Sequence, residues 1–313
     1  MLTFIAKRLA AGIVLIAVIA TITFLLAFSS TSNVARNLLG EAATAEDVAA
    51  KNAELGLDRS LLAQFVDWAG SALGGDFGAS WFTEQPVAEA IRNALPITLS
   101  MVVVGVLLTA VVSVVLGVSA AVRGGWIDRV IQVISVVGFA LPNFWVALIL
   151  VIFFAVSLAI LPATGYVRFG DSPGGWLTSL ILPVTALSLG GIASASQQVR
   201  GAVIDVLRQD FVRTLRARGL GMRSVLFRHA LRNAATPALM VLSLQFIALL
   251  GGAVVIEKVF AIPGLGTLTV DSALRGDIPV LMGIVVTLVA MVVVVNLVID
   301  IASGWVNPKV RVQ

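Results

Sequence analysis

The sequence predicts an all-α integral membrane protein with about six transmembrane helices, and two observations support this fold class. Hydrophobic residues make up 59% of the 313 positions and charged residues only 12%, whereas soluble domains carry about 25% charged residues. Six runs without Asp, Glu, Lys or Arg are also long enough to cross a hydrocarbon core, which takes about 20 helical residues. These runs cover residues 9–28, 97–122, 130–161, 177–199, 234–256 and 278–299.

The apolar runs predict helices because a chain in lipid must satisfy its own backbone hydrogen bonds, and the runs lack the polar alternation of a barrel strand. The first run follows Lys7 and Arg8, as the apolar region of a signal peptide also does. Its length exceeds the roughly 7 to 15 apolar residues of such a region. We therefore interpret it as an uncleaved first span.

The basic residues predict the orientation, since Lys and Arg accumulate on the cytoplasmic side of membrane proteins. The segments before, between and after the spans carry 14 Lys and Arg on one side and 7 on the other. This difference places both termini in the cytosol. Nucleic-acid binding has no support, because the basic residues adjoin spans and do not lie on an aromatic-rich soluble face.

Residues 29–96 form the external segment in this orientation, and they contain nine of the 17 acidic residues. Thr44, followed by Glu46 and Asp47, predicts a capped helix start, and Gly56 predicts its end. A second helix is predicted from an apolar stripe made of Leu61, Leu62, Phe65, Val66 and Ala69.

Two spans contain irregular features. Pro142 removes a backbone donor, so it should kink or break the third run near residues 140–143. That run is too long for one straight span, so either its first part projects into the cytosol or the helix tilts strongly. Small residues at 190–196 in the fourth run permit close helix packing, with a pore-lining role as the alternative.

Few side chains in the apolar runs could contact a passing solute. The candidate path-lining residues are Asn143, Phe144, Trp145, Gln245 and Asn296. Each has an alternative role in packing or in hydrogen bonds between helices. The chain has no cysteine and a single histidine, His229, so we expect no metal site and no catalytic residue.

Residues 200–233 carry eight arginines and face the cytosol in this orientation. Leu207, Phe211 and Leu215 predict one apolar helical stripe. Gly219 and Gly221 predict a helix break, and a second helix should run from Arg223 towards Pro237. An ordinary positive-inside loop is the alternative, because arginines beside a membrane need no partner.

Several segments in order resemble one family: AELGLDRSLLAQF, GGDFGASW, PVAEAIRNALPITL, EKVFAIPGLG and the NPKVR tail. Within residues 200–233, the coupling motif of that family is matched by the triplet Arg213, Thr214 and Leu215 and by Gly219. Nearly the whole chain resembles the permease subunits of ABC importers for dipeptides, oligopeptides and nickel. The resemblance implies the type I importer permease fold and a coupling contact made by Asp210, Phe211, Val212, Arg213, Thr214, Leu215, Arg216, Ala217, Arg218, Gly219 and Leu220.

The resemblance also implies partners. Two separate ATPase subunits would bind ATP and Mg²⁺ and dock on the cytosolic segment, beside a second related permease in a heterodimer and an external solute-binding protein. Transport would proceed by alternating access across the cytoplasmic membrane of a prokaryote. None of the four lysines fits a phosphate-binding GxxxxGK[ST] loop. We therefore expect that this chain is not itself an ATPase or another enzyme, and that it binds no cofactor.

The resemblance places residues 257–266 near the outer mouth of the path. The residues of this candidate outer gate are Glu257, Phe260, Pro263, Gly264 and Gly266. A plain connecting loop with a Glu257–Lys258 surface pair is the alternative.

We expect four parts along the chain. They are the N-terminal cytoplasmic end and first transmembrane helix at 1–28, an external helical segment at 29–96, a permease core at 97–306 with the coupling loop at 200–233, and a cytoplasmic tail at 307–313.

Six apolar helices alone also fit a secondary transporter or a membrane scaffold. A secondary transporter would ordinarily carry ionisable residues near the middle of the membrane, and these runs carry none. Substrate selection is therefore expected to rest mostly with the external binding protein.

Overall fold

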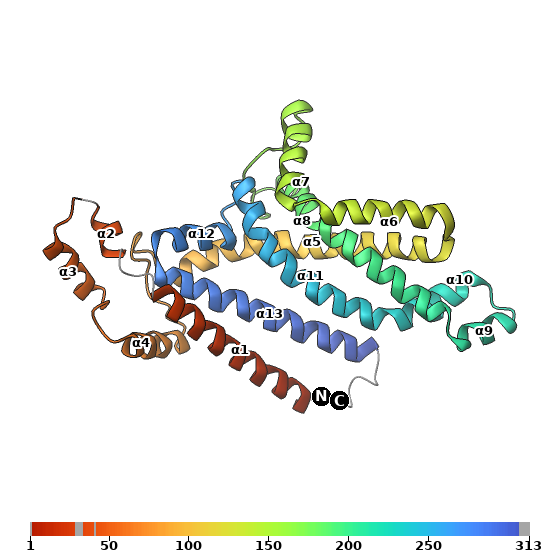
Figure 1. The fold of residues 1–313 in the computed structure, drawn as a ribbon, viewed down its shortest axis with the longest axis horizontal. Coiled ribbons are helices and arrows are strands. Elements are labelled where there is room, and N and C mark those ends of the chain that lie inside the picture. Colours follow the sequence, from red (N-terminus) through yellow and green to blue (C-terminus); the bar gives the residue numbers. More distant parts are fainter. Residues whose placement is uncertain (1, 29–33, 41, 307–313) are drawn as a thin grey trace. The chain divides into compact units, whose positions relative to one another are not determined.

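The computed structural model describes residues 2–28, 34–40 and 42–306, so the predicted tail at 307–313 lies outside it. The described residues form helices joined by turns and contain no β-strand (Figure 1). The helices are α1 (Leu2–Phe28), α2 (Val34–Leu39), α3 (Ala45–Glu54), α4 (Leu61–Leu73), α5 (Val87–Arg123), α6 (Gly125–Ala140), α7 (Asn143–Leu150), a π-helix (Val151–Ser157), α8 (Pro173–Leu207), α9 (Asp210–Ala217), α10 (Met222–Ser224), a second π-helix (Val225–Ala230), α11 (Leu231–Val259), α12 (Leu265–Arg275) and α13 (Ile278–Val306).

Among the described residues, five helices are each long and apolar enough to cross a membrane, and a bent pair of helices provides a sixth candidate span. The five are Ile5–Phe28, Val87–Arg123, Pro173–Leu207, Met240–Val259 and Ile278–Ser303, and the pair is Gly125–Ala140 with Asn143–Ser157. The all-helical, multi-span prediction is therefore confirmed.

The third run is broken at Pro142, as the sequence predicts. Leu141 ends α6 in an extended conformation, and Pro142 precedes the first residue of α7. The two halves meet at 98°. Proline causes this break because it lacks the N–H group that would continue the helical hydrogen bonds and its ring clashes with the preceding turn.

Two predicted helix limits are wrong. The second span begins at Val87 and not at 97, because α5 accommodates Pro96 within the helix. The helix expected to run from Arg223 towards Pro237 and the span expected at 234–256 are not separated at Pro237, because α11 runs from Leu231 to Val259. Membrane helices tolerate internal prolines where neighbouring groups satisfy the freed backbone atoms.

The described chain divides into two compact units, whose boundaries fall inside α5, between α11 and α12, and inside α13. The first unit contains Thr98–Ile262 and the chain from Val295 onwards. Within it, α8 packs against α6, α7 and α11. Small residues allow this close packing: a Cβ added at Gly117 of α5 would lie only 2.7 Å from the backbone oxygen of Ser196 and 2.8 Å from Cβ of Val199. Ser196, one of the small residues of α8, therefore takes part in a close approach to α5.

The substitution Gly117→Ala is expected to lower the free energy of unfolding by about 1–3 kcal/mol, because the added methyl group meets a backbone atom that cannot rotate away. Thermal unfolding of the purified protein in detergent measures this loss. Gly201→Ala is the matched control, since a Cβ there meets no atom within 4 Å. Equal stability of the two variants would contradict the close approach of α5 and α8.

The second unit contains Leu2–Ile97 and Pro263–Val294. One of its cores joins Val87 and Ile91 of α5 to Leu265 of α12 and Ile284 of α13. A second core surrounds Phe24 of α1 and includes residues of α4 and α13. Both cores consist of buried aliphatic and aromatic side chains.

The predicted helices of residues 29–96 are present. Thr44 caps α3, and its hydroxyl and N–H both donate to the Asp47 carboxylate, at 2.6 and 3.1 Å. These hydrogen bonds hold the pKa of Asp47 below its usual range. Gly56 follows α3 with φ +68°, a conformation that favours glycine. The predicted stripe residues belong to α4.

Candidate functional site

The arginine-rich segment forms a helical elbow, which we define as residues 208–230. Figure 1 shows α9 and α10 next to each other at the end of α8. Helix α8 ends at Leu207, and the extended backbone of Gln209 precedes α9. The expected single stripe through Leu207, Phe211 and Leu215 is therefore wrong, because the helix is interrupted between the first two residues. The predicted break does occur at Gly219, where φ is +83°.

The inner face of the elbow packs on the bundle. Val212 is only 2% exposed. Phe211 packs on a cluster of buried residues formed by Val199, Val203, Val206, Leu226 and Ala230. Burying aliphatic and aromatic side chains contributes about 1.5–3 kcal/mol each. These contacts hold α9 firmly against α8 and the second π-helix.

The outer face of the elbow is cationic, with Arg213, Arg216 and Arg218 exposed. Arg213 pairs with Asp210 at 3.3 Å, but both side chains are exposed, and such pairs contribute only about 0–1 kcal/mol. The outer face of the elbow therefore carries an excess of exposed positive charge.

Phe227 is the apolar residue that the sequence reasoning missed as a contact candidate. Its side chain is 63% exposed, and it lines an open hollow of about 660 Å³ with Gly221, Arg223 and Ser224. Phe211, Leu215 and Leu220 are each partly buried. A large apolar residue between Arg223 and Arg228 in a predicted helix was the signal that could have identified Phe227.

An ion pair joins α8 to α6 near the end of α8 that leads into the elbow. Arg200 of α8 donates to both carboxylate oxygens of Asp128 in α6, each at 2.5 Å. The two side chains are 26% and 16% exposed. Bidentate pairing of this kind is strong and directional. Sequence reasoning missed the pair because 72 positions separate its members.

Breaking this pair should be costly. Arg200→Ala is expected to lower the free energy of unfolding by about 2 kcal/mol or more, because the Asp128 carboxylate is left partly buried without its partner. The double variant Asp128→Ala/Arg200→Ala should be more stable than the single variant, since it leaves no charge behind. Thermal unfolding in detergent of the three proteins measures the coupling, and strictly additive losses would contradict it.

The first residue of the candidate outer gate, Glu257, is held in place by burial and a hydrogen bond. Glu257 has no exposed surface, and its carboxylate accepts a hydrogen bond of 2.6 Å from the Thr98 hydroxyl. The alternative of a Glu257–Lys258 surface pair is therefore wrong. Phe260 is also buried, and its carbonyl accepts from the N–H of Gly165 at 2.8 Å. Ala261 adopts φ +51°, a strained conformation for a residue with a side chain.

Two of the candidate path-lining residues lie close to glycines of the neighbouring helices. A Cβ added at Gly190 or Gly252 would lie 3.5 Å from the amide of Asn143, and one added at Gly191 would lie 2.8 Å from Oε1 of Gln245. Thr109, also near Gly191, is buried and its hydroxyl has no hydrogen-bond partner among the described residues. These side chains form a polar group between α5, α7, α8 and α11.

The other candidate path-lining residues lie elsewhere. Phe144 and Trp145 are exposed on α7. Asn296 of α13 accepts a hydrogen bond from the hydroxyl of Ser243 in α11. Asn296 therefore serves a contact between helices.

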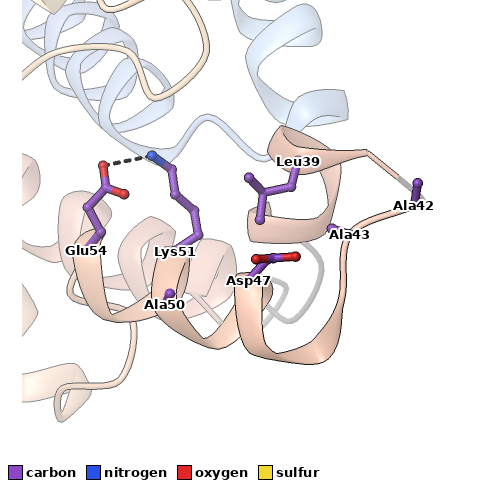
Figure 2. A pocket seen from close by; sticks show the side chains of 7 residues that line it. All are labelled: Leu39, Ala42, Ala43, Asp47, Ala50, Lys51 and Glu54. Atoms are coloured by element: carbon purple, nitrogen blue, oxygen red, sulfur yellow. Dashed lines mark hydrogen bonds and ion pairs between the residues drawn. The ribbon is translucent and has the colours of Figure 1, made fainter.

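A further hollow lies between α2 and α3, and Figure 2 shows the side chains that line it. Its volume is about 490 Å³. Its polar groups are already paired, since Lys51 contacts Glu54 at 2.8 Å and Asp47 accepts from Thr44. We therefore assign it no function. The described residues also contain no cluster of side chains that could hold a metal ion.

These features define a multi-pass helical membrane protein. Residues 113–312 match the family described as binding-protein-dependent transport system inner membrane component, and residues 1–102 match the N-terminal region of such membrane components. The chain belongs to this family of membrane transport components.

Relatives match over the full length. A protein named as a peptide transport system permease in Brucella abortus is 38% identical, covering 99% of both chains. The glutathione transport system permease protein GsiC of Salmonella choleraesuis is 35% identical over 99% of both chains. The di/tripeptide transport system permease protein DppB of Pseudomonas aeruginosa is 34% identical over 100% of both chains.

A solved structure titled as inward-facing conformations of the MetNI methionine ABC transporter has the same fold. The match has a TM-score of 0.57 at 18% identity and covers 69% of this chain and 96% of the other. The type I importer permease fold implied by the sequence is thereby confirmed.

Proposed function

We propose that this chain is the permease subunit of an ATP-driven importer that carries peptides or similar small solutes into the cell by alternating access. The full-length match to permeases named for peptides, dipeptides and tripeptides, and glutathione carries this proposal. In this role the chain provides a passage and performs no catalysis.

The elbow transmits the movement of separate ATPase subunits. Buried Val212 and the packing of Phe211 hold α9 on the bundle, so a force applied to residues 210–220 moves α8 and α11 with it. The exposed arginines orient the partner, and Phe227 supplies an exposed apolar contact. Buried apolar anchors commonly contribute more than about 2 kcal/mol to an interface, and rim charges contribute less. ATP and Mg²⁺ bind to the ATPase subunits.

The polar group around Gln245 serves the path. Asn143, Gln245 and Thr109 offer amide and hydroxyl groups, which suit the peptide bonds of a solute without selecting its side chains. The segment at 257–266 acts as the outer gate, with Glu257 fixing the end of α11 through Thr98. Selection of the solute then falls to an external binding protein.

The assembly contains a second related permease, two ATPase subunits and an external solute-binding protein in a prokaryotic cytoplasmic membrane. The basic elbow and both termini face the cytosol. This orientation follows from the excess of Lys and Arg in the segments assigned to that side.

Uptake by a reconstituted complex tests the proposal. Proteoliposomes that contain this chain, its partner permease and the ATPase subunits should accumulate a labelled dipeptide only when ATP and the external binding protein are both supplied. Accumulation driven by an ion gradient without ATP would favour a secondary transporter. Absence of ATPase subunits and of a second permease from the complex purified from native cells would favour a scaffold.

A further inference from the structure

Two adjacent hollows in the second unit share Asp67, Trp68, Trp81 and Pro279. The first hollow measures about 190 Å³ and is also lined by Arg59, which pairs with Asp67 at 2.7 Å. The second measures about 280 Å³ and adds Asp76, with no basic residue in its lining. We name the second hollow the Trp68 cleft.

The walls of the Trp68 cleft are held in place before any partner arrives. Asp277 accepts hydrogen bonds from the Ser80 hydroxyl at 2.5 Å and from the N–H of Trp81 at 3.2 Å. Trp68 lies against an aromatic cluster, with its ring centroid 6.1 Å from that of Phe65. Rigid aromatic walls reduce the entropy lost on binding.

The lining of the cleft selects a cation with an apolar stem. Two indole rings attract a Lys or Arg side chain by cation–π interaction, and two carboxylates neutralise its charge. The Asp76 carboxylate is oriented by the N–H of Gly78, which donates to it at 2.8 Å. The Asp67 carboxylate is bound only weakly by Arg59, because their ion pair is exposed to solvent. Phosphate or carboxylate ligands are disfavoured by the same two charges.

The volume of the cleft, about 280 Å³, lies at the lower edge of the roughly 300–1,000 Å³ that small-molecule sites enclose. The binding test therefore has to distinguish a single side chain from a small solute.

We propose that the Trp68 cleft receives a lysine or arginine side chain of the external solute-binding protein. This inference rests on the proposed function, which supplies that partner. Residues 29–96 carry nine acidic and four basic residues, so the segment around the cleft attracts a basic surface. The cleft then fixes where that surface docks.

The test compares two double variants with the same change in charge. Asp67→Asn/Asp76→Asn removes both carboxylates of the cleft, and the amide introduced by Asp76→Asn keeps an oxygen to accept from Gly78. Glu46→Gln/Asp58→Asn removes two exposed acids of the same segment that do not line the cleft. The affinity of the complete complex in lipid nanodiscs is measured for the solute-binding protein that supports uptake, at several salt concentrations.

The cleft variant should raise the Kd about five- to tenfold and reduce its salt dependence, whereas the control should change the Kd less than about twofold. Uptake at saturating binding protein should stay normal in both variants, which shows that they fold.

If binding of the solute-binding protein is weakened equally in both variants, or in neither, the inference is overturned. A loss of direct Lys-Ala dipeptide binding, with docking intact, would make the cleft a solute site instead. Failure of wild-type uptake would reject the proposed function itself.

Discussion

The substitution Phe211→Asp is expected to reduce ATP-driven peptide uptake at least about 30-fold while the protein still inserts into the membrane. Phe211 packs on the buried cluster at the ends of α8 and the second π-helix. A carboxylate cannot replace it there without a large desolvation cost. Losing packing worth about 2 kcal/mol shifts the equilibrium between the docked and undocked positions of α9 about 30-fold. Uptake into proteoliposomes measures the loss.

Phe211→Leu is the control, because it keeps an apolar side chain and should retain most of the uptake. ATP hydrolysis is recorded in the same samples. Hydrolysis that continues without uptake identifies uncoupling, and lost hydrolysis identifies failed docking of the ATPase subunits. Normal uptake by Phe211→Asp would contradict the role of α9 as the transmitting element.

The substitution Glu257→Ala is expected to lower the free energy of unfolding by about 2–5 kcal/mol, since it removes the carboxylate that accepts from Thr98 and empties part of a fully buried site. Thr98 then retains a buried hydroxyl that has lost its acceptor at Glu257, and the removed side chain leaves a cavity. Thermal unfolding in detergent measures the loss of stability.

Glu257→Gln keeps an oxygen for the Thr98 hydroxyl and should recover part of the stability. Asp271→Ala is the comparison on α12, where the substituted acid is not fully buried. If Glu257→Ala is no less stable than Asp271→Ala, the carboxylate does not hold the end of α11. Under the proposed function, complexes that contain the Glu257→Ala variant should also let solute leak through the membrane in the absence of ATP.

Local chemistry explains which parts of the fold the sequence could predict. The apolar runs, the proline at 142 and the Thr44–Asp47 cap each act within a few residues, so their effects are visible in the chain itself. The interruption at Arg208–Gln209 was missed because the apolar spacing continues across it. Helix α12 was missed because Leu265–Arg275 is short and partly polar, although its end at Gly276, with φ +78°, is typical of a helix stop.

The contacts that build the sites could not be predicted in the same way. Asp128 meets Arg200, Thr98 meets Glu257, and Ser80 meets Asp277 across 72, 159 and 197 positions. Only the packing of the helices brings these residues together. The exposure of Phe227 and the burial of Val212 likewise depend on how α9 and the second π-helix sit on α8.

A cross-link from the elbow tests the central claim most directly. The chain has no cysteine, so Arg216→Cys introduces a single thiol on the exposed face of α9. A maleimide reagent with a photoreactive group at this thiol should link the chain to an ATPase subunit in inverted membrane vesicles, with a yield that changes when ATP binds. Labelling of the thiol by an impermeant maleimide from outside intact cells, with no ATPase adduct, would contradict the account.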